Sequence, residues 1–188
     1  MTPREKARPA FEVRPGGRTG FALNDRVEGG QGLPMRHFLT RVGGAGRVAG
    51  GDAELAGRDH AARLAAARAA YDAALAAGPT GARAAYEGYR VACEDAAASF
   101  HGALFAVCRR FTSEGQAAYR HALPHLDVEQ TARARHALMA GIEAIGRDVQ
   151  ARARVARTQL EAELVRAEAA VADAARLARG DRIPRKAM

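Results

Sequence analysis

Apolar residues recur at alternating steps of four and three through most of the last third of the chain. A single row of twelve apolar positions can be followed over residues 138–178. This spacing is typical of a helix that packs along a seam with another helix. Asp127 is a suitable N-cap, and the side chain of Gln130 can bond back to it. The pattern predicts a long helix whose interaction seam comprises Leu138, Ile142, Ile145, Val149, Leu160, Leu164 and Val171.

Helical spacing also marks the middle of the chain. Asp52 follows two glycines and is a suitable N-cap for a helix that ends at Gly78 and Pro79, because glycine suits the position after a helix and proline cannot continue it. A second helix begins near Thr80, and capping-box spacing after it predicts a short third helix that stops before Pro124. The predicted helices therefore cover residues 52–77, 80–112, 114–122 and 127–179.

Gly78 and Pro79 permit two arrangements of the first two helices. The broad apolar arc of the second helix favours a reversal, since a helix that is buried on more than one side needs two neighbours. The second helix would then leave residues 158–179 without a partner in the chain, and we expect that end to form a homo-oligomer. A kink instead of a reversal would let the first two helices together cover the whole seam.

Residues 1–51 show no apolar period. They hold eleven of the 20 glycines and four of the seven prolines. We interpret them as a basic arm that is flexible or ordered only by a partner, with at most a short ordered piece over 35–42. The glycines between 43 and 51 lack the spacing of a phosphate-binding loop, so they are interpreted as a hinge. We expect deletion of residues 1–51 to leave the helices intact.

The composition limits the fold class. Alanine accounts for 47 of the 188 residues and arginine for 27, whereas Leu, Ile, Val and Phe together number 33. A thick core is excluded at this apolar content, but alanine is the best helix former and lets helices approach closely. The sequence therefore predicts an all-α protein. We expect an elongated helical bundle or antiparallel coiled-coil hairpin over 52–179, followed by a basic tail over 180–188.

The formal net charge is +8, and the excess lies mostly in the two ends of the chain. Residues 1–51 carry nine basic and four acidic groups, and residues 180–188 carry three and one. Such ends could neutralise phosphates, which gives an alternative function as an architectural nucleic-acid-binding protein. The candidate phosphate contacts are Arg4, Lys6, Arg8, Arg14, Arg18, Arg182, Arg185 and Lys186.

Few residues have the spacing that catalysis or metal binding requires. His121 and His125 are four apart, but Pro124 lies between them, so we interpret them as solvated histidines at a helix junction. Cys93 and Cys108 are expected to lie about 22 Å apart on one helix, where they cannot form a disulfide within the chain. We therefore expect neither an enzyme nor a cofactor or metal site. The remaining candidates are interpreted structurally: Tyr71, Tyr86 and Tyr89 as core, and Glu87, Glu94 and His101 as a solvated strip.

The sequence has no secretory signal, and its longest uncharged run is 13 residues, too short to cross a bilayer. We expect a protein of the cytoplasm or of a virion. A charged, alanine-rich helical hairpin resembles rod-like proteins of bacterial secretion and flagellar export systems and, equally, helical virion proteins. The sequence thus favours a non-enzymatic structural or adaptor protein of a bacterial or phage assembly.

Overall fold

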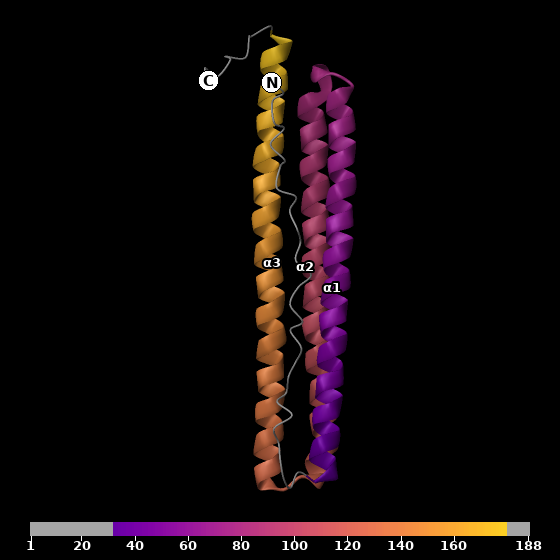
Figure 1. Cartoon of the computed structure of the whole chain (residues 1–188), viewed down its shortest axis with the longest axis vertical. Coiled ribbons are helices and arrows are strands. Elements are labelled where there is room, and N and C mark those ends of the chain that lie inside the picture. The colour runs from indigo at the N-terminus through magenta and orange to yellow at the C-terminus, as the bar shows by residue number, and fades with distance from the viewer. Residues whose placement is uncertain (1–31, 180–188) are drawn as a thin grey trace, which may run out of the picture.

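The computed structural model describes residues 32–179, which form three long helices and contain no strand. Helix α1 spans Leu33–Ala76, α2 spans Ala82–Ala122 and α3 spans Val128–Ala178. Figure 1 shows the three helices side by side, with successive helices running in opposite directions. The 51 residues of α3 correspond to about 76 Å of helix. The predicted all-α class is confirmed.

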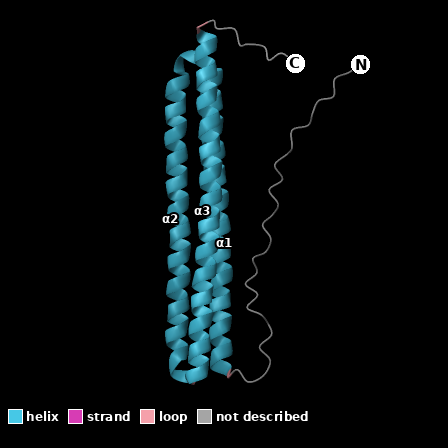
Figure 2. Ribbon diagram, turned by 90° about the vertical axis from the view of Figure 1, so that its left-hand side faces the viewer, coloured by secondary structure: helices cyan, strands magenta, loops and turns pink. Residues whose placement is uncertain are grey.

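Short 3-10 turns make both reversals. Residues Pro79–Gly81 join α1 to α2, and Gly78 before them has a φ of 135°, which glycine adopts without strain. Residues Leu123–His125 join α2 to α3. The reversal at Gly78 is therefore the observed arrangement, as the apolar arc of the second helix predicted. In Figure 2 the start of α1 lies at the same end of the rod as the α2–α3 turn.

The N-terminal limit of the first helix was predicted wrongly. Helix α1 begins at Leu33 instead of Asp52, with Pro34 in its first turn, and it continues through the glycines between 43 and 51. Residues 33–51 are therefore neither arm nor hinge. Proline near the start of a helix is a recognised signal, and it was present in the sequence. The apolar row was obscured because several of its members are glycine or alanine.

The small residues of α1 allow the helices to approach closely. Met35, Phe38 and Val42 are buried, and Gly43 and Gly46 are buried beside them. Met35, Phe38 and Val42 belong to a core cluster with Phe100, Leu104, Phe111, Leu138 and Ile145 from the other two helices. In this cluster α1 supplies three large side chains with small residues between them. The large side chains of α2 and α3 fill the space beside those small residues. Deletion of residues 1–51 would remove part of this core, contrary to our expectation from the sequence.

The predicted short helix over 114–122 is also wrong, because α2 continues without interruption to Ala122. Ser113 is exposed within α2 and does not begin a new helix. Gly115, which we placed near the start of the short helix, is buried against α3. A Cβ atom at Gly115 would lie 2.6 Å from Cδ1 of Leu138. Glycine at this position therefore makes room for a leucine of the neighbouring helix.

The interaction seam of α3 lies inside the chain. Leu138 and Ile145 belong to the core cluster already described, and Ile142 and Val149 pack against it. Near the α1–α2 reversal a second cluster contains Val171, with Leu160 and Leu164 packed at its edge. The seam residues Leu160, Leu164 and Val171 thus pack against the two preceding helices, because α1 and α2 are each long enough to reach them. The unpartnered seam from which we predicted a homo-oligomer is not found in residues 32–179, and the oligomer itself stays a prediction.

The start of α3 agrees with the sequence in detail. The backbone N–H of Gln130 donates to Oδ1 of Asp127 over 2.7 Å, and the Asp127 N–H donates to Oε1 of Gln130 over 3.4 Å. The expected ion pairs between residues four apart are also present, namely Glu129–Arg133, Glu143–Arg147 and Asp148–Arg152.

Among the described residues, α2 with its following turn is long and apolar enough to cross a membrane by length and composition alone. A helix in the core of a bundle passes the same test, and α2 supplies buried residues to both core clusters.

Candidate functional site

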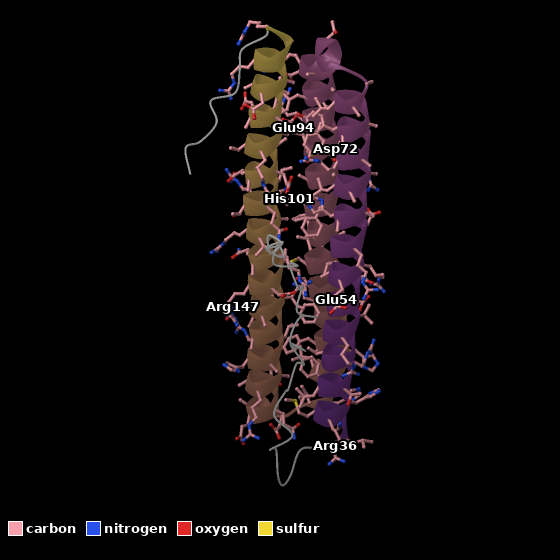
Figure 3. The ribbon with its side chains drawn as sticks, turned by 45° about the horizontal axis from the view of Figure 1, so that its top comes forward. Arg36, Glu54, Asp72, Glu94, His101 and Arg147 are labelled. Atoms are coloured by element: carbon pink, nitrogen blue, oxygen red, sulfur yellow. The ribbon has the colours of Figure 1, made fainter. Side chains whose placement is uncertain are left out.

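The end of the rod where α1 begins carries an apolar groove with basic walls. This end groove lies between the first two turns of α1 and the last two turns of α2, and it has a volume of about 500 Å³. Figure 3 places Arg36 at this end of the molecule, and Asp72 toward the opposite end. The groove is lined by Leu33, Pro34, Arg36, His37, Phe38, Thr40, Arg41, Ala118, His121, Ala122 and His125.

Buried small and aromatic residues form the floor of the end groove. Phe38, Ala118 and Ala122 all belong to the core, so the floor is continuous with the packed interior. The ring of Phe38 meets that of Tyr119 edge to face, with centroids 6.1 Å apart, which fixes the phenylalanine between the helices. Leu33, by contrast, is 80% exposed at the rim. The groove therefore presents uncovered apolar surface above a rigid base.

Two arginines and three histidines line the end groove, and no carboxylate lies among its lining residues. Arg36 and Arg41 come from α1, and neither forms an ion pair with any carboxylate in residues 32–179. Most other arginines of the rod are paired along their own helix, as Arg63 is with Asp59 at 2.8 Å. The end groove thus holds two of the arginines for which residues 32–179 supply no ion-pair partner.

Three histidines also line the end groove, namely His37, His121 and His125. They come from two helices and the turn that follows, and all three are exposed. Within residues 32–179, no three histidine, cysteine or acidic side chains lie close enough to hold a metal ion. These histidines therefore add hydrogen-bonding capacity and polarity to the walls.

A second groove, the side groove, lies between α1 and α3 in the half of the rod nearer the α1–α2 reversal. An ion pair between Arg68 and Glu163 crosses it at 3.3 Å. The groove has a volume of about 870 Å³, and leucine and alanine side chains from both helices line much of it. The Arg68–Glu163 ion pair links the two walls of the side groove, and the tyrosine cluster described next joins the same helices. We therefore interpret the side groove as a consequence of helix packing and not as a binding site.

The tyrosine cluster is core, as the sequence suggested. The rings of Tyr71 and Tyr89 stack at 5.0 Å, and Tyr86 belongs to the same cluster. The Tyr71 hydroxyl donates to the carbonyl oxygen of Ala167 on α3 over 2.7 Å. Burial, together with a hydrogen bond to Cys93, raises the pKa of Tyr89 to about 12. These contacts join all three helices and leave no open stacking surface for a base.

Our sequence analysis did not single out His60, which is the one polar or charged residue buried among the described residues. Its Nδ1 lies 3.2 Å from the carbonyl oxygen of Ala96, and its ring stacks on Phe100 at 4.7 Å. The residue has helical spacing from Ala53 and Leu64 on the buried side of α1, and this signal was present within the predicted helix over 52–77. Its bonding makes it a structural link between α1 and α2.

The other candidates lie where the sequence placed them. Cys93 is fully buried, Cys108 is half-buried, and both are free on α2. Glu87 and Glu94 flank Arg90 on the surface of α2 and pair with it. The candidate phosphate contacts Arg4 to Arg18 and Arg182 to Lys186 all lie outside the described residues.

Comparisons of the chain with protein-family models, with curated proteins and with solved structures found no match.

Proposed function

We propose that the chain is a non-enzymatic structural or adaptor protein of a macromolecular assembly, which docks a protein partner at the end groove of a stiff rod. The observation that carries the proposal is the combination in this groove of an apolar floor with unpaired arginines on its wall. Protein interfaces commonly pair an apolar centre with a charged rim that selects the partner.

The rod supports such a role mechanically. The three helices are joined by contacts along the rod, such as the Tyr71 to Ala167 hydrogen bond near the α1–α2 reversal and the Phe38–Tyr119 ring contact beside the end groove. Near the middle of α1, Asp52 pairs with Arg110 of α2 at 3.1 Å. The groove therefore keeps a fixed position relative to the far end of the rod, as an adaptor between two components requires.

Site-specific photo-crosslinking in the native cell tests the proposal. A photoreactive residue in place of Leu33, at the groove rim, should crosslink to one defined protein, whereas the same residue in place of Ala73, exposed near the α1–α2 reversal, should not. The Leu33 crosslink should disappear when Arg36 and Arg41 are both changed to glutamate. Crosslinks that are equal at the two positions, or that survive the charge reversal, would contradict docking at the groove.

The unpaired arginines also favour the alternative, an architectural nucleic-acid-binding protein. Filter binding to duplex DNA across a range of salt concentrations separates the two. Submicromolar affinity at physiological ionic strength, with a steep fall in affinity as salt rises, would support nucleic-acid binding. Absence of DNA binding would eliminate this alternative.

A further inference from the structure

We infer that the end groove binds an acidic amphipathic helix of a partner protein, with apolar side chains on the floor and carboxylates against Arg36 and Arg41 of the α1 wall. This inference rests on the proposed docking function and specifies the chemistry of the partner. Three features of the groove lead to it: its length, the placement of its charges, and its exposed apolar rim.

The dimensions of the groove suit about two turns of helix. Its α1 wall extends from Leu33 to Arg41 and its α2 wall from Ala118 to His125. At 1.5 Å per residue these walls are about 12 Å and about 10 Å long, the rise of roughly two helical turns. A helix laid between them would place apolar residues three or four positions apart over the floor, as helix-in-groove complexes do.

The charges at this end are available to a partner because nearby carboxylates are engaged elsewhere. Residues 33–51 carry three arginines and no acidic residue, and residues 115–126 likewise contain none. The acidic residues that come next along α1 and α2, Asp52 and Glu114, both pair with Arg110. At the start of α3, Asp127 caps the helix and Glu129 pairs with Arg133. Within residues 32–179 no carboxylate competes for these arginines, so the carboxylates of a partner can reach them.

The arrangement of charge around apolar surface distinguishes a peptide from the other anions. The two arginines of the groove, Arg36 and Arg41, stand on its α1 wall, and the α2 wall adds the polar side chain of His121. A nucleic acid would satisfy the cations but would leave the floor and the exposed Leu33 uncovered, since phosphate contacts bury little apolar surface. An amphipathic helix with acidic flanks would cover the apolar floor and also pair with the arginines. Its apolar stripe lies between its charged edges, as the floor of the groove lies beside the arginines.

The test measures how a fluorescent peptide binds to the full chain. The probe is a peptide of about twelve residues that carries two leucines four apart among glutamates. Two matched peptides separate the apolar contribution to binding from the charge contribution. One replaces the leucines with serine, and the other replaces the glutamates with lysine. We expect saturable binding of the acidic leucine peptide at protein concentrations up to about 100 μM, and at least about tenfold weaker binding of each matched peptide.

Charge-reversal variants locate the binding. The double change Arg36→Glu and Arg41→Glu should weaken binding of the acidic leucine peptide at least about tenfold. The control, Arg58→Glu with Arg154→Glu, changes the net charge equally at exposed arginines outside the groove, and it should leave binding nearly unchanged. Helical circular dichroism should be the same for both variants.

Equal effects of the two variants, or equal binding of the serine peptide, would overturn the inference. Duplex DNA or anionic phospholipid vesicles could also bind more tightly than the acidic leucine peptide. If the Arg36 and Arg41 variant loses that binding, the inference is overturned and the groove is assigned to a different anion. If no peptide binds while the Leu33 crosslink is obtained, the inference fails and the proposed docking function stands. If the peptide binds but no partner is crosslinked in the cell, the proposed function fails and the peptide chemistry of the groove stands.

Discussion

Replacement of Gly115 by alanine provides a quantitative test of the close contact between α2 and α3. The new Cβ would lie 2.6 Å from Cδ1 of Leu138, too close for two carbon atoms, so the leucine or the helix must move. Extra bulk in a packed core costs about 1–3 kcal/mol. Alanine in place of glycine within a helix contributes about 1 kcal/mol in the opposite direction. We therefore expect a net loss of about 0–2 kcal/mol in the free energy of unfolding.

Gly102 provides the matched control. It lies in the same helix, it is exposed, and no atom would lie within 4 Å of an added Cβ. Gly102→Ala should therefore increase the free energy of unfolding by about 1 kcal/mol. Urea unfolding followed by circular dichroism gives both values. The difference of about 1–3 kcal/mol between the two alanine variants isolates the effect of the Leu138 contact, because their helix propensity change is the same.

A double-mutant cycle identifies the leucine as the cause. Leu138→Ala alone is expected to cost about 2–5 kcal/mol, since it leaves a cavity in the core. In the Gly115→Ala background the same change should cost less, because it also relieves the overlap. A Gly115→Ala protein as stable as Gly102→Ala, or strictly additive effects in the cycle, would refute the close contact between the helices.

Four further predictions follow from the packing. The pKa of Tyr89 is raised to about 12 in the folded protein, against about 10 in an unfolded chain. This difference stabilises the folded state below about pH 10, and the contribution is lost as the pH rises from about 10 to about 12. Urea midpoints should fall across this window, and they should fall less in Tyr89→Phe. In the native state a thiol reagent should label Cys108 faster than Cys93, which should react only on unfolding; equal rates, measured by mass spectrometry, would contradict the burial of Cys93. Leu164→Asp should lower the melting temperature, because the half-buried leucine packs against the second core cluster of its own chain; an unchanged melting temperature would show that the site is uncovered. Deletion of residues 1–51 should reduce both helicity and melting temperature, since α1 would lose its first 19 residues; an unchanged melting curve would contradict the packing of those residues.

Local signals in the sequence were sufficient for much of the fold. The apolar period of the last third and the Asp127–Gln130 cap specify α3 almost to the residue, because helix periodicity and capping depend on neighbours in the chain. Gly78 and Pro79 likewise stop one helix and allow the reversal. The absence of a strand followed from alanine content and spacing. The burial of Tyr86, Tyr89 and Cys93 could also be predicted, since these residues share one face of α2.

The start of α1 and the end groove depended on tertiary contacts. Taken alone, residues 33–51 are rich in glycine, which is a poor helix former. The helix forms there because Met35, Phe38 and Val42 pack into the core with Phe111 and Leu138 of the other two helices. The end groove brings together Arg41 and His121, which are 80 positions apart in the sequence, so no local pattern could show that they line one groove. Sequence spacing determines which face of a helix is apolar, but the partner of that face is decided by helix length and close packing.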